Sequence, residues 1–133
     1  MSDASPASAF VRGARLFDDG AFFDAHEAWE ERWRVATDDA ERLFLQGLIQ
    51  VAAGLHKLLV MGGPEAPASR LFARALAKLD ASPADSAAEH GFDLERFREG
   101  VRRCAADLGA ERFDAAAIPV MLRPSPAAPS ASS

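Results

Sequence analysis

The stretch Phe22-Phe-Asp-Ala-His-Glu-Ala-Trp-Glu-Glu-Arg-Trp33 decides how the chain folds. It holds both tryptophans of the protein, one of its three histidines and three glutamates. At about 100° of helical rotation per residue, its large aromatic residues fall mainly on one side of a helix. The stretch therefore predicts an amphipathic helix, from about Ala21 to Val35, whose aromatic side packs against the rest of the protein.

His26 lies on the aromatic side of this predicted helix. Phe22, Trp29 and Trp33 fall within about 60° of it, and Glu30 lies about 40° away on the other side. A buried polar group without a partner costs roughly 1–3 kcal/mol, so we expect both His26 and Glu30 to be paired. Whether their partners are structural or chemical is the question that the sequence raises.

The next helix is predicted over about residues 39–61, and it is apolar around most of its circumference, which is typical of a central helix. Asp38 followed three residues later by Glu41 predicts a capping box at its start. Gly62 and the proline that follows predict its end. Gly47 and Gly54 share one face of this helix, where another helix could approach closely.

Apolar periodicity predicts three further helices, over about residues 6–18, 67–80 and 94–108. The segment Ile118–Leu122 is expected to be extended and to pack over the bundle. No strand pattern is present. The predicted fold class is therefore all-α, a single-domain bundle of about five helices with a central apolar third helix and no sheet.

The ends of the chain differ in composition from its middle. Residues 1–8 are small and polar and are expected to be a disordered arm. Residues 123–133 are expected to be a disordered tail rich in Pro, Ala and Ser. The helical bundle domain is then predicted over residues 9–122.

Composition and charge argue against several function classes. The net charge of −5 disfavours nucleic-acid binding, which needs a basic face. Cys104 is the only cysteine, so no intrachain disulfide can form, and we expect a cytoplasmic location.

The N-terminus lacks the features of a secretory signal. The longest apolar run, Val51–Met61, is interrupted by His56 and Lys57 and is too short to span a bilayer, so no membrane contact is expected. Abundant alanine and arginine suggest a bacterial source.

The pattern His26-Glu27-x-x-Glu30 is close to the zincin motif His-Glu-x-x-His, but Glu30 stands where the second histidine ligand is needed. A histidine and a glutamate four residues apart can still supply two ligands to a divalent metal. The alternative is a His–Glu hydrogen bond inside the aromatic layer, with no cofactor. His56 is not expected to complete a metal site. A hairpin turning near residue 37 would separate it from His26 by about 12 Å along the helix axis.

Gln46 and Gln50 lie level with His26 and Glu30 in the same hairpin. Their amides offer both donors and acceptors and could satisfy the polar pair without a metal. The alternative is that both glutamines belong to a solvated face of the third helix. His90 is expected to be solvated in its loop. The candidate functional cluster comprises His26, Glu27, Glu30, Trp33, Gln46 and Gln50.

Two segments together resemble the domain-of-unknown-function 309 family. They are Phe17-Asp-Asp-Gly-Ala-Phe-Phe-Asp-Ala-His-Glu-Ala-Trp-Glu-Glu-Arg-Trp33 and Phe44-Leu-Gln-Gly-Leu-Ile-Gln-Val-Ala-Ala-Gly-Leu-His56. The resemblance covers about residues 10–80. It implies a small helical bundle of the kind found in bacteria and archaea, with no established activity. It also implies that the family's hallmark polar residues fall on His26, Glu27, Glu30 and Gln50, as a shared site.

Two classes of function remain open. The first is a protein-interaction or scaffold module with a buried His/Glu/Gln polar cluster, and it is favoured because no complete catalytic constellation is present. The second is a metal-dependent, hydrolase-like enzyme in which His26 and Glu30 act as ligands, or as general base and orienter. Either a protein partner or a homodimer is expected, because five helices are too few to cover so apolar a third helix.

Overall fold

The computed structural model describes residues 6–62, 65–110 and 113–122. Over these residues the chain forms five α-helices, one π-helical turn and two short 3-10 turns, with no strand. Their bounds are α1 (Pro6–Asp18), α2 (Phe22–Val35), α3 (Asp39–Leu55), η1 (His56–Val60, the π-helical turn), α4 (Glu65–Asp80), η2 (Ala88–His90), α5 (Leu94–Gly109) and η3 (Ala115–Ala117). The predicted all-α class is confirmed.

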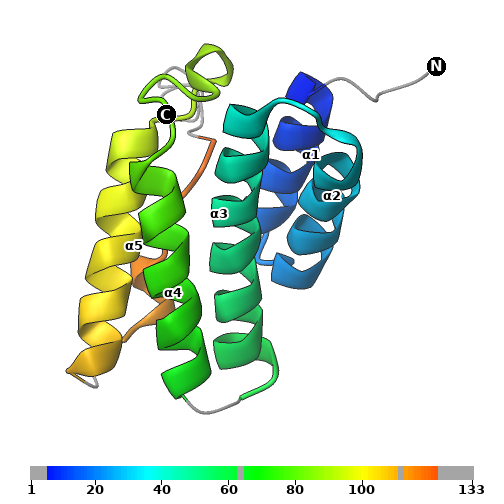
Figure 1. The fold of residues 1–133 in the computed structure, drawn as a ribbon. Helices are drawn as coiled ribbons and strands as arrows, with labels where there is room; N and C mark the ends of the chain where they lie inside the picture. Colours follow the sequence, from blue (N-terminus) through cyan, green and yellow to red (C-terminus); the bar gives the residue numbers. More distant parts are fainter. Residues whose placement is uncertain (1–5, 63–64, 111–112, 123–133) are drawn as a thin grey trace, which may run out of the picture.

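Helix α3 stands in the middle of the bundle (Figure 1). It packs against α2 on one side and α4 on the other, while α1 pairs with α2 and α5 pairs with α4. Both sides of α3 are lined with buried apolar residues, from Phe44 to Leu55. The prediction of a central apolar third helix is therefore confirmed.

The two glycines on one face of α3 explain how closely α4 approaches it. A Cβ on Gly47 would lie 2.8 Å from Leu79, and a Cβ on Gly54 would lie 2.9 Å from Phe72. Neither space is sufficient for a methyl group. The expected close helix approach at these glycines is confirmed, and the approaching helix is α4.

Aromatic rings join α1, α2 and α5 beneath α3. The ring of Phe17 lies 5.2 Å from that of Phe22, 6.1 Å from that of Trp29 and 5.8 Å from that of Phe97. All four side chains are buried. Because Phe22 and Trp29 face this core, the aromatic side of α2 is a packing surface, as the sequence predicts.

The capping box predicted at the start of α3 is half formed. The Asp38 carboxylate accepts a hydrogen bond from the backbone N–H of Glu41 at 2.8 Å, as an N-cap does. The Glu41 side chain does not reach back to Asp38. It accepts hydrogen bonds from Arg32 instead, because an ion pair with a guanidinium is stronger than a bond to one neutral amide.

The long third helix changes character at His56. The prediction extends an unbroken helix to Met61, whereas the structure has α-helix to Leu55 and then the π-helical turn η1. The Met61 N–H closes this turn on the His56 carbonyl at 3.0 Å. The large apolar residues that follow Leu58 are exposed. Spacing alone does not reveal such a turn, because the apolar pattern continues through it.

The 22 residues Asp39–Val60 contain an 18-residue stretch with a mean hydropathy of 1.5, so by length and composition alone this helical segment could cross a membrane. This helical segment is longer than the apolar run that the sequence singles out. The bundle buries 44% of that 18-residue stretch, and the core helix of a soluble protein can be equally long and apolar. The absence of membrane contact therefore stays a prediction.

The last described segment crosses back over the bundle, behind α4 and α5 in the view of Figure 1. Pro119 lies against Gly100 of α5, where an added Cβ would meet the proline ring at 2.7 Å. The backbone N–H groups of Met121 and Leu122 both donate to the Asp18 carboxylate, at 2.7 and 2.9 Å. The expected packing of this segment over the bundle is confirmed.

Some predicted boundaries move or cannot be assessed. Helix α4 begins at Glu65, two residues before its predicted start. Helix α1 begins at Pro6, so the final residues of the predicted arm are helical. Residues 1–5 and the predicted tail, 123–133, lie outside the described residues.

Candidate functional site

The hairpin of α2 and α3 is held at its turn by two arginines. Arg32 donates to both carboxylate oxygens of Glu41, at 2.7 and 3.0 Å, and both side chains are largely buried. This hydrogen bond is the main reason that the pKa of Arg32 is raised. Arg42 donates from one nitrogen to the carbonyls of Trp33 and Ala36, at 2.8 and 3.1 Å. It thereby satisfies carbonyls that the end of α2 leaves free.

His26 projects from the second turn of α2, beside two glutamates. Its Nδ1 lies 3.4 Å from Glu27 Oε2, and its Nε2 lies 3.9 Å from Glu30 Oε1. Neither approach is a hydrogen bond, and Nδ1 is buried without a partner in the described part of the chain. The predicted proximity of His26 and Glu30 is observed, but the hydrogen bond that was the alternative to a metal is not formed.

The aromatic neighbour of His26 is Phe23. The two rings stack at 24°, with centroids 5.9 Å apart. The sequence places Phe22, Trp29 and Trp33 nearest to His26, but Phe22 and Trp29 are buried in the core instead. Helical side chains lean toward the N-terminus of their helix, so His26 covers the residue three positions before it.

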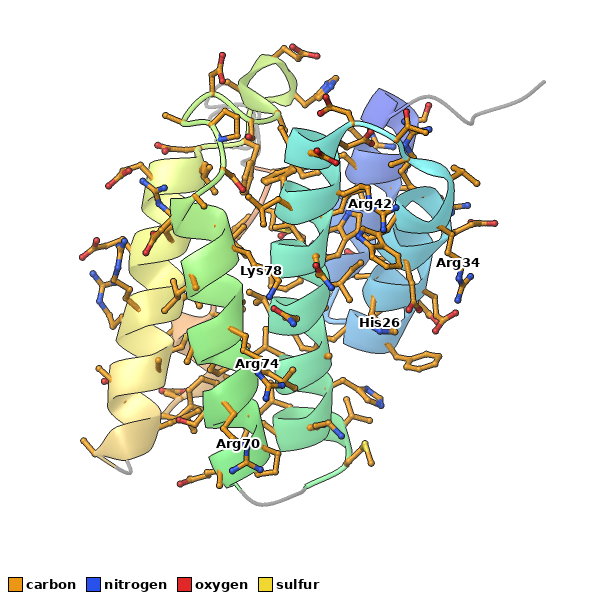
Figure 2. All side chains as sticks on the ribbon, in the orientation of Figure 1. His26, Arg34, Arg42, Arg70, Arg74 and Lys78 are labelled. Atoms are coloured by element: carbon orange, nitrogen blue, oxygen red, sulfur yellow. The ribbon has the colours of Figure 1, made fainter. Side chains whose placement is uncertain are left out.

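Glu27 and Glu30 belong to the same polar group as His26. One ligand-type atom from each of the three side chains can be chosen so that all lie within 4.8 Å of one another. Glu30 Oε1 is also 3.5 Å from Arg34, which lies four residues later on the same helix. Figure 2 shows His26 and Arg34 on α2, with α3 between them and α4.

The two glutamines do not bond to His26 or Glu30 in the described structure. Gln46 and Gln50 are half-buried on α3, and the Gln50 Oε1 atom is buried without a hydrogen-bond partner. The Trp33 Nε1 atom is also buried and unpaired, while the Trp33 ring carries the Arg42 guanidinium 4.2 Å above its centroid. Helical register brought the glutamines level with His26, but register does not determine where side chains point.

His56 contacts the candidate cluster through Phe23. The ring of Phe23 lies 5.3 Å from the His56 ring, so it is a neighbour of both histidines. His56 is half-buried, and its Nδ1 is buried without a partner. Sequence reasoning missed Phe23, although its spacing of three residues from His26 on a predicted helix is the signal that could have identified it.

A row of cations runs along α4, across α3 from this cluster. Figure 2 shows Arg70, Arg74 and Lys78 spaced one helical turn apart along that helix. Within the described residues, none of the three has an acidic partner within salt-bridge distance. These three cations form no ion pair with the acidic residues of α2 in the described structure, so they make no direct contribution to the candidate site.

A cavity of about 290 Å³ lies elsewhere, at the other end of α3. Phe10 and Phe44 line it, together with the η2 turn. His90 lines this cavity, with its ring 6.1 Å from that of Phe10 and with a side chain 24% exposed. His90 is therefore half-buried and less exposed than the sequence predicts, because the η2 turn places its ring beside Phe10 of α1.

Residues 10–66 match the model of the family Domain of unknown function (DUF309). The resemblance seen in the sequence is therefore confirmed over this segment. No curated protein matches the chain.

The DUF309 segment runs from Phe10 in α1 to the first residues of α4. It contains every residue of the candidate cluster, and also Phe23 and His56. Most of α4 and all of α5 lie beyond it. The family description carries no activity, so the function of this chain is argued from its own surfaces and side chains.

Proposed function

We propose that this chain is a protein-interaction module that associates with a second copy of itself. The surface concerned is the apolar end of the α2–α3 hairpin, made of Phe23, Leu59, Val60 and Met61. The observation that carries the proposal is the exposure of these large apolar side chains, at 51%, 39%, 62% and 62% respectively.

These side chains are connected through His56. The Phe23 ring lies 5.3 Å from the His56 ring, and His56 opens the π-helical turn that carries Leu59 and Val60. Met61 closes that turn through its hydrogen bond to the His56 carbonyl. His56 therefore links Phe23 of α2 to the turn that carries the other three residues, which supports treating them as one surface. Scattered single apolar residues on a surface need no explanation, whereas a contiguous group indicates an interaction site.

Self-association fits the composition of this surface. A cluster of like apolar side chains is complementary to itself about a two-fold axis, and two-fold dimers are the commonest soluble oligomers. Lys57 is the only charged residue between Leu55 and Gly62, so this half of the surface adds little like-charge repulsion between two copies. Leu59, Val60 and Met61 are also the large apolar side chains that stay exposed at the end of the long third helical segment.

Sedimentation of the wild-type protein and of two matched variants tests this proposal. Val60→Asp places a charge in the apolar end, whereas Val35→Asp places the same charge on a valine of similar exposure outside it. We expect a wild-type dimer that Val60→Asp dissociates and Val35→Asp preserves. A wild-type monomer at all concentrations, or equal dissociation by both variants, would contradict the proposal.

Flotation with lipid vesicles tests whether the same surface binds a membrane instead of a second copy of the protein. The length and apolar character of Asp39–Val60 make this comparison necessary. If the wild-type protein is monomeric and floats with vesicles while Val60→Asp does not, the surface binds lipid and self-association is wrong. We expect both proteins to remain in the soluble fraction.

A second candidate function is a metal-dependent, hydrolase-like enzyme using His26 and Glu30. The observation that favours it is the grouping of His26, Glu27 and Glu30 on a partly exposed surface, since catalytic metal sites keep positions open for water and substrate. Hydrolysis of a p-nitrophenyl ester in the presence of Zn²⁺, and its loss in Glu30→Gln, would support this function. Equal rates in the two proteins would contradict it.

A further inference from the structure

We propose that His26, Glu27 and Glu30 of α2 together bind one divalent transition-metal ion. This proposal does not rest on the self-association proposed above, although Phe23 borders both surfaces, and the enzyme candidate requires the metal site. The two carboxylates and the imidazole come from positions i, i+1 and i+4 of a single helix, so the backbone itself sets their spacing.

The distances among the three side chains are close to those of a metal site. One ligand atom from each side chain can be chosen so that all three lie within 4.8 Å of one another. Glu27 faces the imidazole Nδ1 at 3.4 Å and Glu30 faces Nε2 at 3.9 Å, so an ion held by one of these nitrogens requires the carboxylate beside the other nitrogen to rotate toward it. An ion with bonds of about 2.1 Å holds its tetrahedral ligand atoms about 3.4 Å apart. Small side-chain rotations would therefore bring all three residues to bonding distance.

Hydrogen bonding within the group does not account for these three side chains. His26 Nδ1 is buried and has no hydrogen-bond partner, although a carboxylate oxygen lies 3.4 Å away. Buried polar atoms are almost always paired, and each exception calls for an explanation. A metal ion would explain the grouping, because it binds the imidazole through one nitrogen and attracts both carboxylates.

Neighbouring residues hold the ligands in position. Phe23 stacks on the His26 ring and restricts its rotation. Arg34 lies 3.5 Å from Glu30 Oε1 and can orient that carboxylate from outside the site. Such outer contacts commonly fix the orientation of metal ligands.

The ligand chemistry indicates which ions fit. One imidazole nitrogen and two carboxylate oxygens suit Zn²⁺, Co²⁺ or Mn²⁺, whereas Ca²⁺ and Mg²⁺ prefer oxygen ligands alone. The side chains of His26, Glu27 and Glu30 are 22%, 49% and 31% exposed. The remaining coordination positions would therefore face solvent and be filled by water.

Titration calorimetry with Zn²⁺ alone, on the full chain, tests the site. Glu27→Gln and Glu31→Gln form a matched pair, because both change a glutamate on α2 and only Glu27 lies beside His26. Glu31 pairs with Arg12 at 2.7 Å instead. We expect one equivalent of Zn²⁺ to bind the wild-type protein, with at least tenfold weaker binding in Glu27→Gln and His26→Ala, and unchanged binding in Glu31→Gln.

Co²⁺ absorption supplies a second measurement that does not depend on heat. The wild-type protein should give the visible bands of Co²⁺ in a low-symmetry N/O site, and Glu30→Gln, which keeps the size of the side chain, should lose them. Circular dichroism establishes that each variant is folded, and Glu30→Gln replaces His26→Ala if the latter is unfolded. Failure of the wild-type protein to bind either ion, or equal affinity in Glu27→Gln and Glu31→Gln, would overturn the proposal. Neither outcome bears on the sedimentation result.

Discussion

The indole ring of Trp29 lies directly against the backbone of Gly13. A Cβ placed on Gly13 would be 2.5 Å from Trp29 Cε2 and 2.6 Å from Cδ1, well inside contact distance. The Trp29 Nε1 atom donates a hydrogen bond to the Phe10 carbonyl at 3.2 Å, three residues before the glycine. Helix α1 therefore packs on α2 through a residue without a side chain, and this contact sets how closely the two helices approach.

Replacing Gly13 with alanine should destabilise the protein by about 1–3 kcal/mol or more, because the methyl group would displace a fully buried indole. Urea unfolding followed by tryptophan fluorescence measures this loss. In a helix, alanine is normally more stabilising than glycine by roughly 1 kcal/mol. Helix propensity alone would therefore predict a gain in stability, whereas the contact with Trp29 predicts a loss.

Gly109→Ala is the control for this prediction. Gly109 ends α5, and a Cβ there would meet nothing within 4 Å. Its replacement should leave the free energy of unfolding unchanged or raise it by up to about 1 kcal/mol. If Gly13→Ala and Gly109→Ala change the free energy of unfolding by the same amount, the contact between Gly13 and Trp29 is not the reason that Gly13 is needed.

Arg42 joins the end of α2 to the start of α3, and its removal should loosen the hairpin. Arg42→Ala loses two hydrogen bonds to carbonyls of α2 and the contact of the guanidinium with the Trp33 ring. We expect a loss of about 1–3 kcal/mol in the free energy of unfolding. Urea titration measures it, and a shift of tryptophan emission would report the newly exposed Trp33 ring.

Arg70→Ala on α4 is the matched control for Arg42. Arg70 is exposed and has no hydrogen bond or ion pair within the described part of the chain, so its replacement should change stability by no more than about 0.5 kcal/mol. A loss at Arg70 as large as that at Arg42 would mean that arginine matters here through general charge balance rather than through its contacts.

Most of the fold could be predicted because it depends on local signals. Apolar periodicity located the helices, Gly20 ends the first one with a φ of +85°, and Asp38 and Asp93 cap α3 and α5. The role of Gly13 was not predictable. Gly13 is needed because Trp29, sixteen positions later, packs against its backbone, whereas helical periodicity shows only which face of a helix a residue occupies.

The candidate site was predicted less completely than the fold. Helical spacing brought His26 and Glu30 together, since positions i and i+4 meet on any helix. It could not determine that Glu41 bonds to Arg32, or that Gln50 leaves its amide oxygen unpaired. The link between His26 and His56 depends on the π-helical turn and on the direction of the Phe23 ring, and neither follows from spacing.

Asp18 gives the stability of the protein a specific pH dependence. Burial is the largest cause of the raised pKa of Asp18, and the charge of Asp19 adds to it, while hydrogen bonds from Met121 and Leu122 oppose it. Because the folded-state pKa lies above the ordinary value of 3.8, protonation favours the folded state. This contribution is fully present below pH 3.8 and is lost as the pH rises through the folded-state pKa.

The free energy of unfolding of wild type and Asp18→Asn, measured across acid pH, tests this sign. The stability of the wild-type protein relative to Asp18→Asn should fall as the pH rises from about 3 to 7. Asp19→Asn should reduce the change, because it removes one of the causes of the shift. A relative stability that rises with pH would show that the hydrogen bonds to the carboxylate outweigh its burial.

Cys104 should be unreactive in the folded protein. Its side chain is buried on α5, its Sγ lies 3.8 Å from the Ala117 carbonyl, and burial is the main reason that its pKa is raised to about 11. The thiolate is the nucleophile in thiol modification, so both its low population and its burial slow the reaction. At pH 8 we expect an aromatic disulfide reagent to react with urea-unfolded protein at least tenfold faster than with folded protein.

The segment over α5 controls this protection, and Gly100 provides the means to test it. Gly100→Ala places a methyl group 2.7 Å from the Pro119 ring, which should lift the segment that carries the Ala117 carbonyl off Cys104. The folded variant should therefore react faster with the disulfide reagent than the wild-type protein, whereas Gly109→Ala on the same helix should not. Equal rates in Gly100→Ala and Gly109→Ala would mean that the packing of α5 on the bundle core, rather than the crossing segment, protects the thiol.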